Sequence, residues 1–246
     1  MGSFRQARET RAVRGTWRQA RACGAFRLLL STLLLCHWLC AGCTCMPSIN
    51  TYSTPRTVPG PKLEHTVAAE GFVDLRHRRR GVQRTMPLPA AYALRFGYLE
   101  RADLGVRVAS PGSVVLDTKW NFLRSRVFDA AIDPGVAYEV GFETLRAWWH
   151  WPLMVGVNFG DWLSMVFVQG VSRMYAQRNV DPVDVELFRN DDLYYRAGLG
   201  LDVRIAGSYA LHPEATIMHP IASREEITLP LQLGMAFRMG GLPSYP

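Results

Sequence analysis

The sequence VVLDTKWNF at residues 114–122 decides the fold, because its side chains alternate in character from one residue to the next. One face of this stretch is apolar apart from a threonine. The opposite face carries Asp117, Lys119 and Asn121 behind a single valine. A period of two residues is the signature of a β-strand that presents its two faces to different environments.

The same alternation recurs along most of the chain after residue 62. We expect about ten strands, near residues 64–75, 88–98, 102–109, 113–124, 127–140, 151–160, 162–176, 193–206, 209–219 and 226–239. Most are about 9–13 residues long, which exceeds the usual length in soluble sheets and suits a tilted strand that crosses a membrane. No amphipathic helix of three turns is expected after Cys45, so the chain is predicted to be all-β.

The connections between these segments alternate in length. Those after the even-numbered strands are tight, whereas most of the others are long, including the loops predicted at Gly141–His150 and Gln177–Asp192. Short turns at one end and long loops at the other are typical of outer-membrane barrels. A sheet in lipid must also close on itself, since an unpaired edge is costly there. The sequence therefore predicts a closed antiparallel up-and-down transmembrane β-barrel of about ten strands, with eight to twelve possible.

The alternation alone does not say which face points inward. A soluble up-and-down barrel holds its apolar residues inside, whereas a membrane barrel turns them to the lipid. Aromatic residues near the strand ends favour the second arrangement, because they suit an interfacial belt: Trp148, Trp149, Trp151, Trp162, Tyr194 and Tyr195.

The N-terminal stretch indicates export. An arginine-rich lead precedes an apolar run of about 12 residues, Leu28–Leu39, which is too short to span a bilayer as a helix. The ending LCAGC at residues 39–43 resembles a bacterial lipobox, although Cys40 replaces the usual aliphatic residue. We expect a signal peptide at 1–42, a lipidated tether at 43–62 that starts at Cys43, a barrel at 63–240 and a C-terminal tail at 241–246. Ordinary cleavage after Gly42 and an uncleaved anchor are the alternatives.

Charge and cysteine usage narrow the function. The whole chain carries a formal net charge of +7, but residues 1–42 hold seven arginines and one glutamate, which leaves the remainder at +1. The high pI thus gives no argument for nucleic acid. Residues 46–246 contain no cysteine, so no disulfide framework or thiolate metal site is expected. We predict no cofactor and no metal.

The chain resembles small outer-membrane β-barrel proteins of Gram-negative bacteria that carry a lipobox-type signal. The resemblance rests on residues 39–43, the hairpin 94–107, Asp133-Pro134-Gly135 and the alternating strand 227–237. It implies insertion in the outer membrane with both termini in the periplasm. The implied partners are membrane lipids and the machineries for barrel assembly and lipoprotein sorting. Such barrels usually end on an aromatic residue, whereas here RMGGLPSYP follows Phe237.

The charged face of the strands predicts a polar lumen. Its expected members are Asp117, Lys119, Asn121, Asp129, Asp133, Arg196, Asp202 and Arg204. A barrel of about eight strands is just wide enough for its own side chains, so we expect paired charges to plug the lumen. Within this face, Asp133-Pro134-Gly135 predicts a bulge or kink, because proline donates no ladder hydrogen bond. A ligand-contacting role for Asp133 is the alternative.

Three functions are compared. A structural or surface-binding role, exerted through the loops at 141–150 and 177–192, is preferred over a narrow pore for ions or small solutes. Arginines of the first long loop suit lipopolysaccharide phosphates: Arg76, Arg78, Arg79 and Arg80. A lipid-modifying enzyme ranks last, since no histidine forms a His-x-Ser pair, and the chain is predicted not to be an enzyme. The sequence indicates no particular ligand or oligomeric state.

Overall fold

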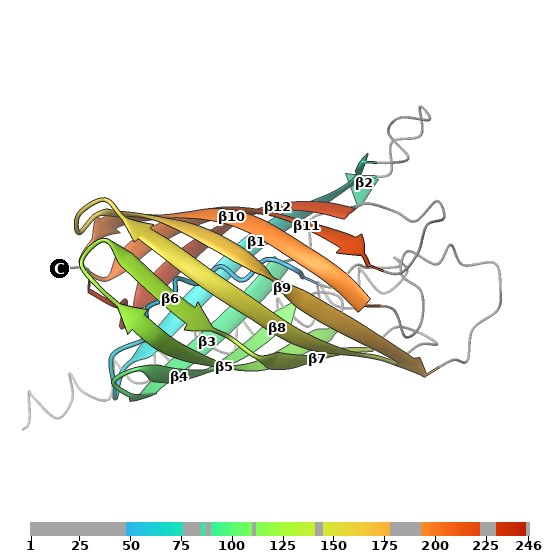
Figure 1. Cartoon of the computed structure of the whole chain (residues 1–246), viewed down its shortest axis with the longest axis horizontal. Helices are drawn as coiled ribbons and strands as arrows, with labels where there is room; N and C mark the ends of the chain where they lie inside the picture. Colours follow the sequence, from blue (N-terminus) through green and yellow to red (C-terminus); the bar gives the residue numbers. More distant parts are fainter. Residues whose placement is uncertain are drawn as a thin grey trace, which may run out of the picture. The chain divides into compact units, whose positions relative to one another are not determined.

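Antiparallel strands close into a β-barrel in the computed structural model of the chain (Figure 1). The structure describes residues 48–75, 85–86, 90–109, 112–140, 145–177, 193–221 and 230–244. The strands are β1 (Leu63–Asp74), β2 (Thr85–Met86), β3 (Ala90–Leu99), β4 (Ala102–Ala109), β5 (Ser113–Arg124), β6 (Phe128–Ile132), β7 (Gly135–Val140), β8 (Leu145–Asn158), β9 (Leu163–Gln177), β10 (Leu193–Ala206), β11 (Tyr209–Pro220) and β12 (Pro230–Gly240).

The first and last strands pair with each other and so remove the free edge. β1 and β12 run antiparallel in register from Glu64 opposite Gly240 to Asp74 opposite Pro230. The strands follow one another around the wall in the up-and-down order β1-β3-β4-β5-β6-β8-β9-β10-β11-β12, with β2 also paired to β1 and β7 paired to β5 and β8. The wall has ten strand positions, which we call staves. β2 and β3 occupy one position, since both pair with the same side of β1, and β6 and β7 occupy another, between β5 and β8. The predicted ten-stranded closed barrel is confirmed.

The break between β6 and β7 falls at the predicted proline. β6 ends at Ile132 and β7 begins at Gly135, with Asp133 and Pro134 between them. Pro134 has no N–H to donate, yet its carbonyl still accepts a hydrogen bond from Thr118 N at 3.0 Å. The prediction of a local irregularity here is confirmed.

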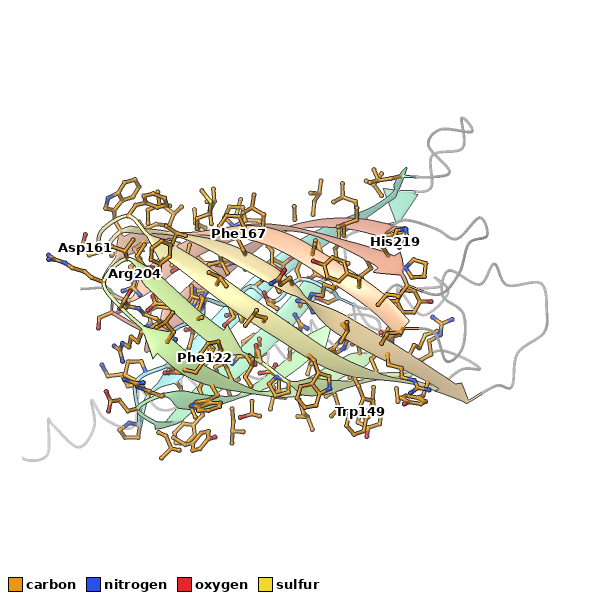
Figure 2. The ribbon with its side chains drawn as sticks, viewed as in Figure 1. Phe122, Trp149, Asp161, Phe167, Arg204 and His219 are labelled. Carbon is orange, nitrogen blue, oxygen red and sulfur yellow. The ribbon has the colours of Figure 1, made fainter. Side chains whose placement is uncertain are left out.

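The two faces of the wall follow the alternation in the sequence. Along β5, Val114, Leu116, Trp120 and Phe122 are exposed, whereas the side chain of Lys119 and its inward-facing neighbours lie inside. Figure 2 shows Phe122, Trp149 and Phe167 on the outer wall. The outer surface of the barrel is therefore apolar and the inner surface polar, which is the reverse of a soluble up-and-down barrel.

One strand begins earlier than the sequence predicted. β8 starts at Leu145, so residues 145–150 belong to the wall, and the expected loop at Gly141–His150 is wrong over most of its length. The alternation was hidden because a bulky aromatic residue, Trp148, occupies an inward position and lies fully buried in the lumen. Tyr194 is likewise buried inside. These two residues do not belong to the predicted aromatic belt, whereas Trp149 and Trp151 do face outward.

The two ends of the barrel differ. The connections β3–β4, β5–β6, β8–β9 and β10–β11 are all short, and they lie at one end, which we call the turn end (left in Figure 1). The opposite end, the loop end, carries the connection of residues 178–192, which lies outside the described residues together with residues 222–229. Among the described residues, no helix has the length and apolar character needed to cross a membrane.

Candidate functional site in the barrel lumen

The residues predicted to line the lumen do face it. Lys119, Asn121, Asp129, Asp133, Arg196 and Asp202 are buried, and Asp117 and Arg204 are half-buried. Arg204 lies near the turn end (Figure 2). The sequence did not reveal what these side chains contact, because three of them, Lys119, Asn121 and Asp129, have partners outside the strands.

An extended segment, residues 48–58, runs through the lumen (blue in Figure 1). All of its residues are buried except Thr51, which is half-buried. Its N-terminal part lies beside Glu70 of β1, and its C-terminal part reaches Asp103 near the turn end. The sequence predicted this stretch to be a tether. It is extended, as a tether would be, but the wall of the barrel encloses it.

Carboxylate and amide oxygens of the wall accept hydrogen bonds from main-chain N–H groups of the segment. Four of these bonds have N···O distances of 2.6–2.8 Å: Ile49 to Gln232, Thr51 and Tyr52 to Glu214, and Val58 to Asp103. Hydrogen bonds to charged acceptors are stronger than those between neutral groups. The wall thus satisfies donors that an extended chain cannot satisfy by itself.

Main-chain carbonyls of the segment are satisfied in the same way, by donors of the wall. Arg107 donates to the carbonyl of Asn50. Further along the segment, Lys119 Nζ lies 3.0 Å from Thr54 O, and Asn121 Nδ2 lies 3.1 Å from Pro55 O. Arg107, Lys119 and Asn121 of the wall therefore bind the main chain of the segment, and Lys119 and Asn121 also bind other residues of the wall.

Arg56 fixes the segment at the turn end. Its guanidinium is 2% exposed, and its Nε donates to Asp129 Oδ2 at 2.7 Å. The two remaining nitrogens donate to the main-chain carbonyls of Ser125, at 2.8 Å, and of Ser244. Asn158 Nδ2 also donates to Asp129 Oδ2, at 2.6 Å. The segment, a wall turn and the C-terminal tail are joined through one arginine.

Arg95 organises a second group of charges. It pairs with Asp133 at 2.8 Å and also donates to Asp103 and Asp117. Lys119 Nζ lies 3.3 Å from Asp103 as well. A buried ion is tolerable only when its partners replace the water it has lost. Asp133 therefore has a structural partner in the wall.

A third group lies on β1, β10, β11 and β12. Arg238 pairs with Glu64 at 2.9 Å and with Asp202. His212 lies between two carboxylates, with Nδ1 at 3.3 Å from Asp202 and Nε2 at 3.5 Å from Glu214. Because Glu214 also binds the main chain of the segment, this network connects the wall to the segment.

Tyr52 sits against a floor of small residues. It packs with Ala68, Ala91, Ala109 and Ala236, and its ring meets His212 edge-on at 6.3 Å. Asn50 Nδ2 donates to the Tyr52 hydroxyl at 2.8 Å. A side chain at Gly234 would overlap this hydroxyl, which explains the glycine in β12.

Apolar side chains surround the N-terminal part of the segment. Ile49 belongs to a buried cluster that also contains Phe72, Val115, Ala137, Trp148, Met174, Tyr194 and Met218. Trp148 stacks on His150 with ring centroids 6.1 Å apart. The lumen is therefore closed by a hydrophobic layer around Ile49 as well as by charges.

Sequence reasoning missed several of the residues that line the lumen around the segment. Glu70, His212, Glu214 and Gln232 contact the segment from inward positions, so their polarity was visible in the alternation. Their partner was not visible, because residues 48–58 have no period. The number of strands was the one indication that the lumen holds something else, because a barrel of ten staves is wider than the eight-stranded barrel that side chains alone fill.

Some predicted features lie outside the described residues. These are the lipidation site Cys43 and the arginines Arg76, Arg78, Arg79 and Arg80. Among the described residues, no group of three or more histidine, cysteine, aspartate or glutamate side chains could hold a metal ion.

Comparisons with known proteins return similar folds at low similarity. No protein-family model matches the chain, and no curated protein matches it. Among solved structures, a bacterial polysaccharide outer membrane secretin is 14% identical, over 62% of this chain and 56% of its own, with a TM-score of 0.39. The attachment invasion locus protein Ail of Yersinia pestis is 10% identical, over 72% and 97%, with a TM-score of 0.32.

The outer membrane protease OmpT of Escherichia coli is also similar, at 10% identity over 77% of this chain and 98% of OmpT, with a TM-score of 0.37. The similar barrels thus include an enzyme. The prediction that this chain is not an enzyme is corrected on this ground, because barrel architecture is compatible with catalysis. At 10% identity, OmpT gives no support for an activity in this chain.

A substitution at Gly234 tests whether the segment lies in the lumen. Gly234→Ala should destabilise the folded barrel by about 1–3 kcal/mol, because the new Cβ overlaps the Tyr52 hydroxyl. In a Tyr52→Ala background the same change should cost less than about 1 kcal/mol, which a double-mutant cycle in urea would measure.

The matched control is Gly207→Ala, at a turn position where a Cβ meets nothing within 4 Å. It should change the free energy of unfolding by less than about 0.5 kcal/mol. Equal costs of Gly234→Ala with and without Tyr52 would place the segment outside the lumen.

Proposed function

We propose that the protein is an integral outer-membrane β-barrel lipoprotein with a structural or surface-binding role, whose lumen is closed by its own N-terminal segment. The distribution of side chains supports this proposal. Large apolar residues are exposed around the outer wall, among them Leu104, Leu116, Phe167, Leu199 and Leu233, while charged residues are buried inside. Lipid outside such a wall removes the cost of its exposure to water.

We propose further that residues 1–42 are a signal peptide, that Cys43 carries the lipid, and that the turn end, with the start of β1 and the C-terminus, faces the periplasm. The predicted periplasmic N-terminus is not part of this proposal, because the segment runs from Ser48, beside Glu70, towards the turn end at Val58. The short turns support this orientation, because such turns are periplasmic in bacterial outer-membrane barrels. The C-terminal tail lies at the same end, where Ser244 accepts a hydrogen bond from Arg56. Barrel-assembly and lipoprotein-sorting machineries are the partners that this route to the membrane requires.

The membrane assignment predicts a depth-dependent cost of charge on the outer wall. Leu199→Arg, near the middle of β10, should lower the free energy of unfolding in lipid vesicles by about 2–4 kcal/mol. Ile205→Arg, on the same face near the turn end, should cost about 0–1 kcal/mol. Equal costs at the two positions would contradict a bilayer around the barrel.

The closed lumen predicts that the reconstituted protein does not conduct. Planar bilayers that contain the folded wild-type protein should show no stable conductance steps in concentrated KCl, because the segment fills the barrel. Regular steps from the wild-type protein would favour the narrow pore instead.

We also propose that Arg76, Arg78, Arg79 and Arg80 contact lipopolysaccharide phosphates, since guanidinium groups pair with phosphate in a bidentate manner. Replacing Arg78, Arg79 and Arg80 with serine should lower the amount of lipopolysaccharide that copurifies with the barrel by roughly half or more, because three phosphate-binding guanidinium groups are lost. Unchanged copurification, measured by phosphate content, would remove this part of the proposal.

A further inference from the structure

The contacts between wall and segment are of an unusual kind for a single folded chain. Side chains of β4, β5, β11 and β12 bind the main chain of residues 48–58, as receptors bind an extended peptide. Among the described residues, no main-chain hydrogen bond joins this segment to a strand of the wall. The segment is therefore held as a ligand is held, not as a strand of the sheet.

The wall does not need the segment for its own hydrogen bonding. Its ladder is closed by the pairing of β1 with β12, and the segment adds no strand to it. The connection to β1 runs through Gly60, Pro61 and Lys62, which are exposed at the turn end. Removing residues 48–58 would thus expose polar side chains to water in the lumen and would break no strand pairing.

We propose that the lumen is a binding tunnel for an extended peptide, and that residues 48–58 are its resident, exchangeable ligand. This inference rests on the proposed barrel and names the ligand class of its lumen. The acceptors Glu214, Gln232 and Asp103 fix the main-chain N–H groups, and Arg107, Lys119 and Asn121 fix the carbonyls. Such recognition reads the direction and the extension of a chain rather than its side chains.

Three subsites add selectivity for side chains. An apolar subsite with Phe72 and Trp148 holds Ile49, and the floor of small residues with Gly234 holds the ring of Tyr52. Asp129 holds Arg56 at the turn end. The preferred ligand is therefore an extended peptide with an aliphatic residue, an aromatic residue three positions later and an arginine four positions after that.

The test uses the full chain with a protease recognition sequence inserted between Pro61 and Lys62. The protein is folded, shown to be heat-modifiable on a gel, and then cut. A fluorescent peptide with the sequence of residues 48–58 should enter the cut barrel and replace the resident segment, with competition by the unlabelled peptide. The Arg56→Ala change in the peptide should weaken binding about tenfold or more, because the buried carboxylate of Asp129 loses its arginine partner.

Backbone methylation separates peptide recognition from simple filling of space. N-methylation at Ile49, Tyr52 and Val58 removes three N–H donors that bind the wall and should weaken binding by about a hundredfold or more. N-methylation at Ser53 and Thr54 is the matched control, since no hydrogen bond from these N–H groups is found among the described residues, and it should change affinity only about threefold.

Several outcomes would overturn the inference. They are equal binding of the two methylated peptides, absence of exchange in a cut barrel that remains folded, and unfolding of the barrel upon cutting. None of them bears on the membrane assignment, which the cost of arginine at Leu199 and Ile205 tests separately. Entry of the peptide with the predicted order of affinities would establish the tunnel.

Discussion

A polar group enclosed by this barrel is costly unless it finds a partner, because a buried donor, acceptor or charge gives up its hydrogen bonds to water. The constraint acts first on the wall. The pairing of β1 with β12 leaves no row of unpaired main-chain groups at an open edge. It acts next on the lumen, where charged side chains lie beyond the reach of bulk water. Residues 48–58 supply partners for many of these charged side chains.

The segment and the charges of the wall satisfy one another. An extended chain outside a sheet has unpaired N–H and C=O groups along its length. In the lumen, the N–H groups donate to Glu214, Gln232 and Asp103. The C=O groups accept from Arg107, Lys119 and Asn121. Arg56 in turn neutralises Asp129. Neither partner could be buried at low cost without the other, so the closed lumen depends on both.

The sequence predicted the wall well for a simple physical reason. Alternation has a period of two only when the two faces of a strand meet different surroundings. The sequences of β5, β10 and β12 therefore indicated a strand conformation and which residues share a face, and the aromatic residues near the strand ends favoured the apolar face outside. Closure followed from the cost of an edge in lipid. The start of β8 was predicted wrongly because Trp148 faces the lumen, where the pattern called for a polar residue.

The content of the lumen could not be predicted in the same way. Residues 48–58 owe their conformation to long-range contacts with β1, β4, β5, β11 and β12, and such contacts leave no local period in the sequence. Their prolines and hydroxyl residues are equally typical of a linker. Only the strand number indicated that something besides the side chains of the wall must fill ten staves.

Amide hydrogen exchange in the folded barrel measures the central interaction most directly. The account predicts that the N–H groups of Ile49, Tyr52 and Val58, each bound to the wall, exchange as slowly as those of neighbouring strands such as β12. Exchange of these three amides at the rate of an unstructured peptide would show that the segment is a free tether, and would contradict the closed lumen.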